Sequence, residues 1–173
     1  MLSLKKLYVY FMNELKFTIN YQHFQALNEL DPADIDLCLK AEEALQTSYS
    51  PYSKFRVGTA ILLADGEVIL GSNQENVAYP SGLCAERVAL FAIGALRPGA
   101  VIKAMAITAQ TDNFEIKKPV TPCGACLQVM SEFEQRQNTE IDVIFYCIGG
   151  EALKVKGIKS LLPFAFLEDR LVG

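Results

Sequence analysis

The sequence predicts an α/β fold, a three-layer α/β/α sandwich on one mixed sheet of about five strands. Two apolar segments in a hairpin pattern come first, and strand-like segments then alternate with helix-like ones. Such an alternation is typical of a sheet with helices on both faces. Hydrophobic residues make up 51% of the 173 residues. A chain of this length and composition can bury a full core without disulfides.

The start of the chain has the weakest pattern. We predict residues 1–30 to be an N-terminal extension and residues 31–173 to be a single domain. Residues 1–12 combine two adjacent lysines with a short apolar stretch, but no small-residue cleavage site follows, as it would in a secretory signal. We therefore expect a disordered start, or a true start at Met12. Residues 16–21 form a candidate short strand.

Three helices are predicted. The first spans residues 31–46, because Asp31 can cap it and Pro32 suits the first helical position. The second spans about residues 84–96 and the third about residues 123–133, both with apolar side chains at helical spacing. These side chains are Val88, Phe91, Ala92, Ala95 and Leu96 in the second helix, and Cys126, Val129, Met130 and Phe133 in the third.

The strands begin with a hairpin. Residues 55–63 and 67–72 are its two arms, joined by a turn in which Gly66 can take positive φ. Three further strands are predicted at residues 104–109, 141–147 and 152–155. The apolar segment 160–170 ends the pattern.

Charge argues against a nucleic-acid partner. The formal net charge is −4 and the pI is about 5.1, whereas a nucleic-acid binder usually carries a basic face. Lysine and arginine are scattered, with no more than two in a row. No run of about 18 apolar residues exists, so no membrane partner is predicted either. A small-molecule substrate fits these properties better.

The number of cysteines indicates the compartment. There are five, and an odd number argues against a secreted disulfide framework. We expect reduced thiols in a cytoplasmic protein. Cys38 is expected in the core and Cys147 at its edge, which leaves Cys84, Cys123 and Cys126 to explain.

These three cysteines carry the most informative pattern. The C-x-x-C pair of Cys123 and Cys126 is compatible with half a zinc site, a redox pair or coincidence. A redox pair needs no third cysteine, yet Cys84 stands at the predicted start of one helix as the pair does at the start of another. If the helices pack side by side, three thiols meet at two helix N-termini, whose partial positive charge lowers thiol pKa values.

Three protein ligands leave the fourth position of a tetrahedral Zn²⁺ open, which is typical of a catalytic zinc. Glu86 follows Cys84 by two residues, and a carboxylate there can accept and pass on the proton of a zinc-bound water. Elsewhere such a glutamate would be a solvated first-turn residue. Three thiolates also leave a net negative charge, which Arg87 offsets if it donates to a ligand sulfur. The alternative for Arg87 is a surface position.

Taken together, Cys84-Ala85-Glu86 and Pro122-Cys123-Gly124-Ala125-Cys126 resemble the signature of the zinc nucleoside deaminases. More narrowly, the chain is similar to the small homotetrameric cytidine deaminases over about residues 41–167. The resemblance implies one Zn²⁺ per subunit on the three cysteines, with Glu86 as the catalytic residue. It implies hydrolytic deamination of cytidine and deoxycytidine to uridine, deoxyuridine and ammonia, in pyrimidine salvage.

The resemblance also assigns substrate contacts. Asn73 and Glu75 match positions that bind the sugar hydroxyls, and an amide with a carboxylate supplies the donor and acceptors that hydroxyls need. Phe55 matches the aromatic residue that packs against the pyrimidine, although Arg56 replaces the small residue or proline expected after it. Main-chain groups around Ala85 would hold the edge of the base.

The same resemblance implies an assembly. Tyr79 and Phe166 match positions that reach a neighbouring subunit, so the active sites would be shared within a homotetramer. Three other functions remain open at this stage: a polynucleotide deaminase of the same superfamily, a deaminase of a modified cytosine nucleoside, and a non-enzymatic zinc-binding protein. The acidic surface disfavours the first, and the open zinc site with an adjacent glutamate disfavours the last.

Overall fold

A computed structural model describes residues 15–168 of the chain. The expectations for residues 1–12 and for the last residues of the C-terminal segment lie outside the described part. Within it, nine main elements follow one another, with bounds β1 (Tyr21–Phe24), α1 (Pro32–Ala44), β2 (Phe55–Leu63), β3 (Val68–Ser72), α2 (Ala85–Leu96), β4 (Ile102–Thr111), α3 (Gly124–Gln137), β5 (Asp142–Tyr146) and β6 (Ala152–Lys156). Four single 3₁₀ turns accompany them, at Leu27–Glu29, Leu45–Thr47, Tyr79–Ser81 and Ile158–Ser160.

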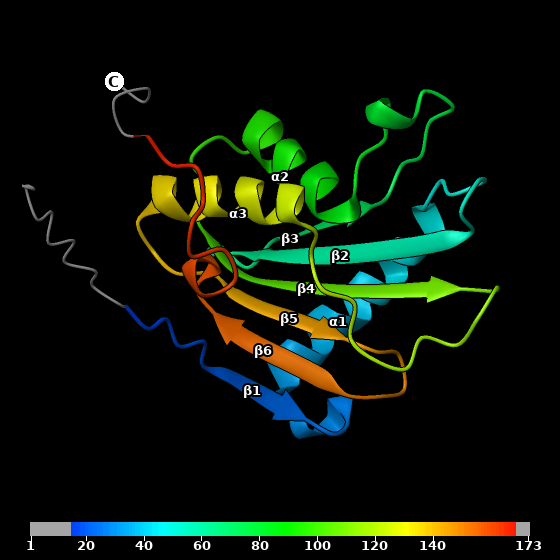
Figure 1. The fold of residues 1–173 in the computed structure, drawn as a ribbon, viewed down its shortest axis with the longest axis horizontal. Helices are drawn as coiled ribbons and strands as arrows, with labels where there is room; N and C mark the ends of the chain where they lie inside the picture. The colour runs from blue at the N-terminus through cyan, green and yellow to red at the C-terminus, as the bar shows by residue number, and fades with distance from the viewer. Residues whose placement is uncertain (1–14, 169–173) are drawn as a thin grey trace, which may run out of the picture.

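The strands form one mixed sheet in the order β1-β6-β5-β4-β2-β3. The β4–β5 pair is parallel, and the other pairs are antiparallel. Helix α1 covers one face of the sheet, and α2 and α3 lie together on the other (Figure 1). The predicted three-layer α/β/α sandwich is therefore confirmed.

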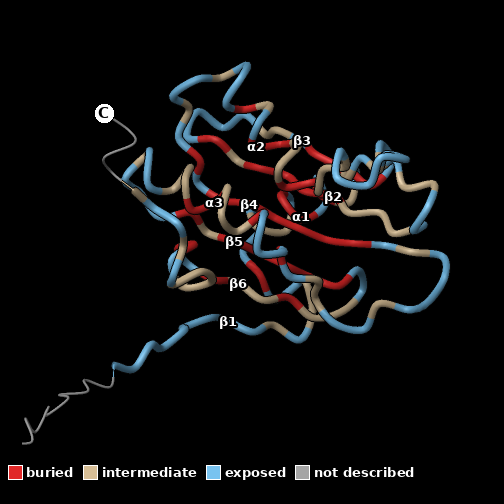
Figure 2. Tube along the Cα trace, turned by 45° about the horizontal axis from the view of Figure 1, so that its top comes forward, coloured by how far each residue is buried: buried red, intermediate tan, exposed pale blue. Residues whose placement is uncertain are grey.

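Alternate residues of the central strands face opposite layers, as the two-residue period of a strand requires. On β4, Met105 and Ile107 are buried beneath α2 and α3, whereas Ala104 and Ala106 are buried against α1. The central strands are buried along most of their length, while the segment before β1 is exposed (Figure 2). No helix within residues 15–168 has both the length and the apolar character needed to cross a bilayer.

The sheet has six strands rather than about five, because β1 adds to the edge of β6. Tyr21 pairs with Val155 and Phe24 with Ala152. The candidate strand at residues 16–21 was wrong in its bounds, since only Tyr21 of that range is in β1. The register explains the difference: Tyr21 pairs with Val155, β6 ends one residue later at Lys156, and the chain turns at Gly157, where φ is +80°. Residues 16–19 therefore have no strand beside them.

The helices begin close to their predicted starts but differ in their buried faces. On α2 the buried residues include Ala89, Leu90 and Ile93, whereas Phe91 and Leu96 are 48% and 77% exposed. The apolar pattern of α2 is therefore wider than the face it buries. On α1, Asp31 is the N-cap residue but its side chain makes no capping hydrogen bond.

One glycine brings α2 close to the sheet. A Cβ at Gly71 of β3 would lie 2.5 Å from the carbonyl oxygen of Ala85 and 2.8 Å from the Ala89 nitrogen. No side chain fits at this distance, so β3 needs glycine where the first turn of α2 crosses it. This contact fixes the position of Cys84, which immediately precedes the helix.

Candidate zinc centre and substrate site

The topology brings the three cysteines to one end of the sheet. Strands β3 and β4 both run antiparallel to β2, so their carboxyl ends lie at the same end of the sheet, and α2 and α3 begin after them. Cys84 is the N-cap residue of α2, Cys123 is the N-cap residue of α3, and Cys126 lies in the first turn of α3. The predicted meeting of three thiols at two helix N-termini is confirmed.

The sulfur geometry suits a single metal ion. Cys84 Sγ lies 4.0 Å from Cys123 Sγ, which lies 3.4 Å from Cys126 Sγ, and all three sulfurs lie within 4.8 Å of one another. Tetrahedral zinc with Zn–S bonds of about 2.3 Å holds its sulfurs roughly 3.8 Å apart. These residues therefore fit Zn²⁺. Within residues 15–168 they are the one group of three or more metal-ligating side chains close enough to hold an ion.

The surroundings of the cluster favour a thiolate at Cys84, whereas the hydrogen bond with Cys84 raises the pKa of Cys126. A hydrogen bond from the Cys126 thiol lowers the pKa of Cys84 to about 5, against the opposing effect of burial, and Arg87 adds to the lowering. The Arg87 Nη2 donates to Cys84 Sγ at 3.8 Å. Arg87 Nε is buried without a hydrogen-bond partner in the described residues. A cation with an unused buried donor beside these sulfurs is compatible with an anionic ligand set.

Glu86 is the acidic group of the site. It lies in the first turn of α2 and is only 4% exposed. Burial raises the pKa of its carboxyl, and the neighbouring charge of Cys84 raises it further. A buried carboxyl group with a raised pKa beside a metal centre is suited to accept a proton and pass it on.

Asn73 and Glu75 follow β3 at the same end of the sheet. The Asn73 Oδ1 accepts hydrogen bonds from Val57 N at 2.7 Å and Ser48 Oγ at 2.6 Å, and its Nδ2 donates to Phe55 O at 2.8 Å. Glu75 Oε2 accepts from the main-chain nitrogens of Tyr52 and Ser53. A hydrogen bond from Ser53 is the largest effect that lowers the pKa of Glu75, so this group is a carboxylate.

Phe55 starts β2 on the side of the sheet that carries α2 and α3, because it shares the face of Val57 and Ile61. Its ring stacks on Phe114, with centroids 6.3 Å apart. Arg56 points to the opposite face and forms a two-bond pair with Asp112. The arginine that differs from the family pattern therefore does not compete with Phe55 for space.

The other predicted contacts differ in exposure. Ala85 is fully buried, whereas Tyr79 is 91% and Phe166 72% exposed. The side chain of Gln128 on α3 holds the main chain of Phe166 through two hydrogen bonds, at 2.7 and 2.9 Å. Gln128, Ser48 and Phe114 were not predicted from the sequence, because each contacts a partner that is distant in sequence.

The remaining cysteines lie outside the cluster, as predicted. Cys38 is completely buried and Cys147 is 6% exposed. The Cys147 thiol donates to Ile116 O at 2.7 Å, and burial raises its pKa. Neither thiol is available to close the fourth position of a metal held by the other three.

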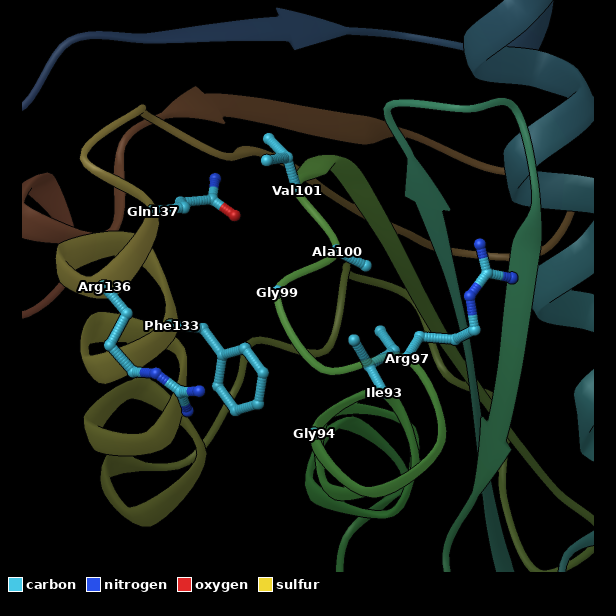
Figure 3. A pocket seen from close by; sticks show the side chains of 9 residues that line it. All are labelled: Ile93, Gly94, Arg97, Gly99, Ala100, Val101, Phe133, Arg136 and Gln137. Carbon is cyan, nitrogen blue, oxygen red and sulfur yellow. The ribbon is translucent and has the colours of Figure 1, made fainter.

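A surface pocket between α2 and α3 is not this site. Ile93 and Arg97 line it from the end of α2, and Phe133, Arg136 and Gln137 line it from the end of α3 (Figure 3). The cysteines lie at the opposite, N-terminal ends of both helices. The cysteine cluster and this pocket therefore lie at opposite ends of the two helices.

Comparison with known proteins agrees with the geometry. Residues 32–139 match the family model of the cytidine and deoxycytidylate deaminase zinc-binding region. The chain is 39% identical over 136 residues to a cytidine deaminase of Sporosarcina psychrophila, covering 78% of this chain and 92% of that protein. It is 47% identical over 133 residues to the cytidine deaminase of Halalkalibacterium halodurans, covering 77% and 93%.

Solved structures give the same result. A cytidine deaminase from Burkholderia pseudomallei superimposes with a TM-score of 0.66 at 38% identity, covering 76% of this chain and 97% of that one. The enzyme of Mycobacterium tuberculosis gives 0.60 at 30% identity, covering 80% and 100%. By its family match, its relatives and its cluster of three cysteines, this chain belongs to the zinc-dependent cytidine and deoxycytidylate deaminase family.

Proposed function

We propose that this protein is a cytidine deaminase, which converts cytidine and deoxycytidine with water to uridine, deoxyuridine and ammonia. The observation that carries the proposal is the group of three thiols within 4.8 Å of one another. The buried carboxyl of Glu86 lies two residues after one of them, Cys84, in the first turn of α2. The names of the relatives support a cytosine nucleoside as the substrate. The physiological role that follows is pyrimidine salvage.

Cys84, Cys123 and Cys126 are the proposed ligands of the ion. Zn²⁺ held by these three residues would supply a Lewis acid and lower the pKa of a water molecule. Arg87 balances the negative charge of the thiolates by donating to Cys84. Its charge thus preserves the acidity of the centre.

Glu86 moves the protons of the reaction. It takes a proton from the attacking water and delivers it to N3 of the base as C4 is attacked. It then takes the second proton and gives it to the departing amine, so that the carboxylate is restored and ammonia leaves. Its burial at 4% exposure keeps bulk water from intercepting these protons.

The remaining residues hold the nucleoside. Phe55 packs against the pyrimidine, and main-chain groups around Ala85 hold the edge of the base. Asn73 and Glu75 bind the sugar hydroxyls. The lysines and arginines of the acidic chain are scattered along the sequence, with no more than two in a row, which supports a free nucleoside rather than a nucleic acid as partner.

The proposed assembly is a cytoplasmic homotetramer with shared active sites. Tyr79 and Phe166 reach the neighbouring subunit in this assembly, and their exposed rings support it, as do the exposed Phe91 and Leu96 of α2. Sedimentation at micromolar concentration should give the mass of four chains, and a monomer would contradict the assembly.

One assay tests the function. Purified protein with its zinc content measured is mixed with cytidine, deoxycytidine and a cytosine-containing nucleoside antibiotic, and the loss of cytosine absorbance is followed. We expect turnover of the first two and release of ammonia in equal amount. Turnover of the antibiotic alone would assign the protein to a modified nucleoside. No turnover by zinc-loaded protein would contradict the proposal.

A further inference from the structure

Ser48 donates a hydrogen bond to Asn73, the side chain proposed to bind the sugar. It follows the 3₁₀ turn Leu45–Thr47, which continues directly from α1. Its neighbour Tyr49 is held beside the loop after β3, since Tyr49 N donates to Asn73 O at 3.0 Å and Glu75 N donates to Tyr49 O at 2.8 Å. The Ser48 hydroxyl is thus carried to Asn73 by a fixed main chain.

The main chain of β2 sets the amide of Asn73. Val57 N must donate, so the atom that faces it at 2.7 Å is Oδ1. Phe55 O must accept, so the atom that faces it at 2.8 Å is Nδ2. The orientation leaves Ser48 Oγ, 2.6 Å from Oδ1, as a donor to the second lone pair of that oxygen.

The amide of Asn73 consequently has one hydrogen-bonding group without a partner among these contacts, the second N–H of Nδ2. A side-chain amide has two acceptor lone pairs and two N–H donors, and three of these four are used by Val57, Ser48 and Phe55. Glu75, by contrast, is an acceptor only, with Oε2 occupied by Tyr52 N and Ser53 N. A single N–H and a carboxylate oxygen together match one hydroxyl that accepts from the first and donates to the second.

We propose that Ser48 is a positioning residue for sugar recognition, which makes Asn73 a pure donor toward a hydroxyl of the nucleoside. The proposal rests on the cytidine deaminase function and on the sugar contact of Asn73. Without the Ser48 hydroxyl, Oδ1 regains a free lone pair, and the amide competes with Glu75 for the same hydroxyl hydrogen. Sugar recognition then weakens, while the zinc centre is untouched.

The experiment compares two substrates in three variants. Steady-state kinetics are measured with cytidine and with 2′,3′-dideoxycytidine, which lacks both ring hydroxyls, for wild type, Ser48→Ala and Ser48→Thr. In Ser48→Ala we expect kcat/KM for cytidine to fall by roughly 3- to 10-fold, the range of one hydrogen bond. The loss should lie in KM, and the dideoxy substrate should be unaffected. Ser48→Thr keeps the hydroxyl and should restore wild-type selectivity.

Ser50→Ala is the matched control, because Ser50 Oγ lies 3.3 Å from Ser48 Oγ but does not contact Asn73. It should leave both substrates unchanged. Equal losses on the two substrates in Ser48→Ala would overturn the inference, as would wild-type protein that does not distinguish them. If zinc-loaded wild type deaminates no cytosine nucleoside, the proposed function fails as well. Normal cytidine turnover with an unchanged substrate ratio in Ser48→Ala would overturn the inference alone.

Discussion

The metal end of this site, formed by the three cysteines, and its proposed sugar end, formed by Asn73 and Glu75, are built in different ways. The three sulfurs stand at the N-termini of two helices and bond mainly with one another and with Arg87. Asn73 and Glu75 lie on a loop, and their side chains form most of their hydrogen bonds with main-chain groups of the protein. The side chains of the metal end therefore serve to bind the metal ion and do not connect strands. Those of the sugar end also hold the start of β2 in place.

This difference has consequences for mutation. A change at the metal end should remove chemistry and leave the fold intact, because the sulfurs do not link strands. A change at the sugar end should alter binding and local stability together, since Asn73 joins Phe55 and Val57 to the loop after β3. Variants of the two ends can be ranked by the size of the effect on activity.

The largest effect is expected from Cys126→Ala. Its thiol is fully buried among the other two, so the remaining pair should bind zinc too weakly to retain it. We expect protein with almost no zinc and no detectable turnover of cytidine, measured by elemental analysis and ammonia release. Cys147→Ala is the control, and should retain both. A Cys126→Ala protein with full zinc and full activity would remove this residue from the metal site.

Glu86→Gln should have the next largest effect. The amide keeps the shape of the side chain but cannot accept and release the proton, so kcat should fall by about 10²- to 10⁴-fold. Zinc content should stay at the wild-type value. The measurement is single-turnover deamination together with metal analysis. Turnover within a few-fold of wild type would show that another group carries the proton.

Arg87→Gln tests the charge balance of the metal end. Loss of the donor to Cys84 Sγ should lower zinc affinity or kcat/KM by about 10- to 100-fold, as for other groups that orient metal ligands. Arg87→Lys, which retains the charge, should recover part of the loss. Competition with a chelator measures the affinity, and unchanged affinity and rate in Arg87→Gln would assign this side chain to the surface instead.

Glu75→Gln should have the smallest effect and a different character. Glutamine keeps an oxygen that can accept from Tyr52 N and Ser53 N, so the loop is retained while the carboxylate charge is lost. We expect KM for cytidine to rise about 10-fold with kcat nearly unchanged. A fall in kcat without a change in KM would place Glu75 in the chemical step rather than in sugar binding.

Sequence predicted the metal end better than the sugar end for a physical reason. Thiols at helix starts have few roles, so two local motifs identified the cluster although Cys84 and Cys123 are 39 residues apart. The hydroxyl of Ser48 has many roles, and its bond to Asn73 spans 25 residues. Nothing local to Ser48 distinguishes it from the other serines of its loop.

The same contrast holds for the fold. The strand at residues 55–63 was predicted with its observed bounds, because its apolar run is bounded by loop and turn residues. Strand β1 forms by pairing with β6, more than 120 residues later in the sequence. Its four residues carry no pattern that predicts this pairing. On α2 the apolar pattern could not separate Leu90, which faces the core, from the exposed Phe91, since packing against the sheet selects the buried side.

A zinc titration of metal-free protein tests directly whether the three cysteines form a catalytic zinc site. Zinc is removed by a chelator, and cytidine deamination is measured as Zn²⁺ is added back in known amounts. We expect no activity without zinc, a linear rise in rate, and saturation at about one zinc per chain, the capacity of one three-cysteine site. Full cytidine deamination by metal-free protein would contradict a catalytic zinc site.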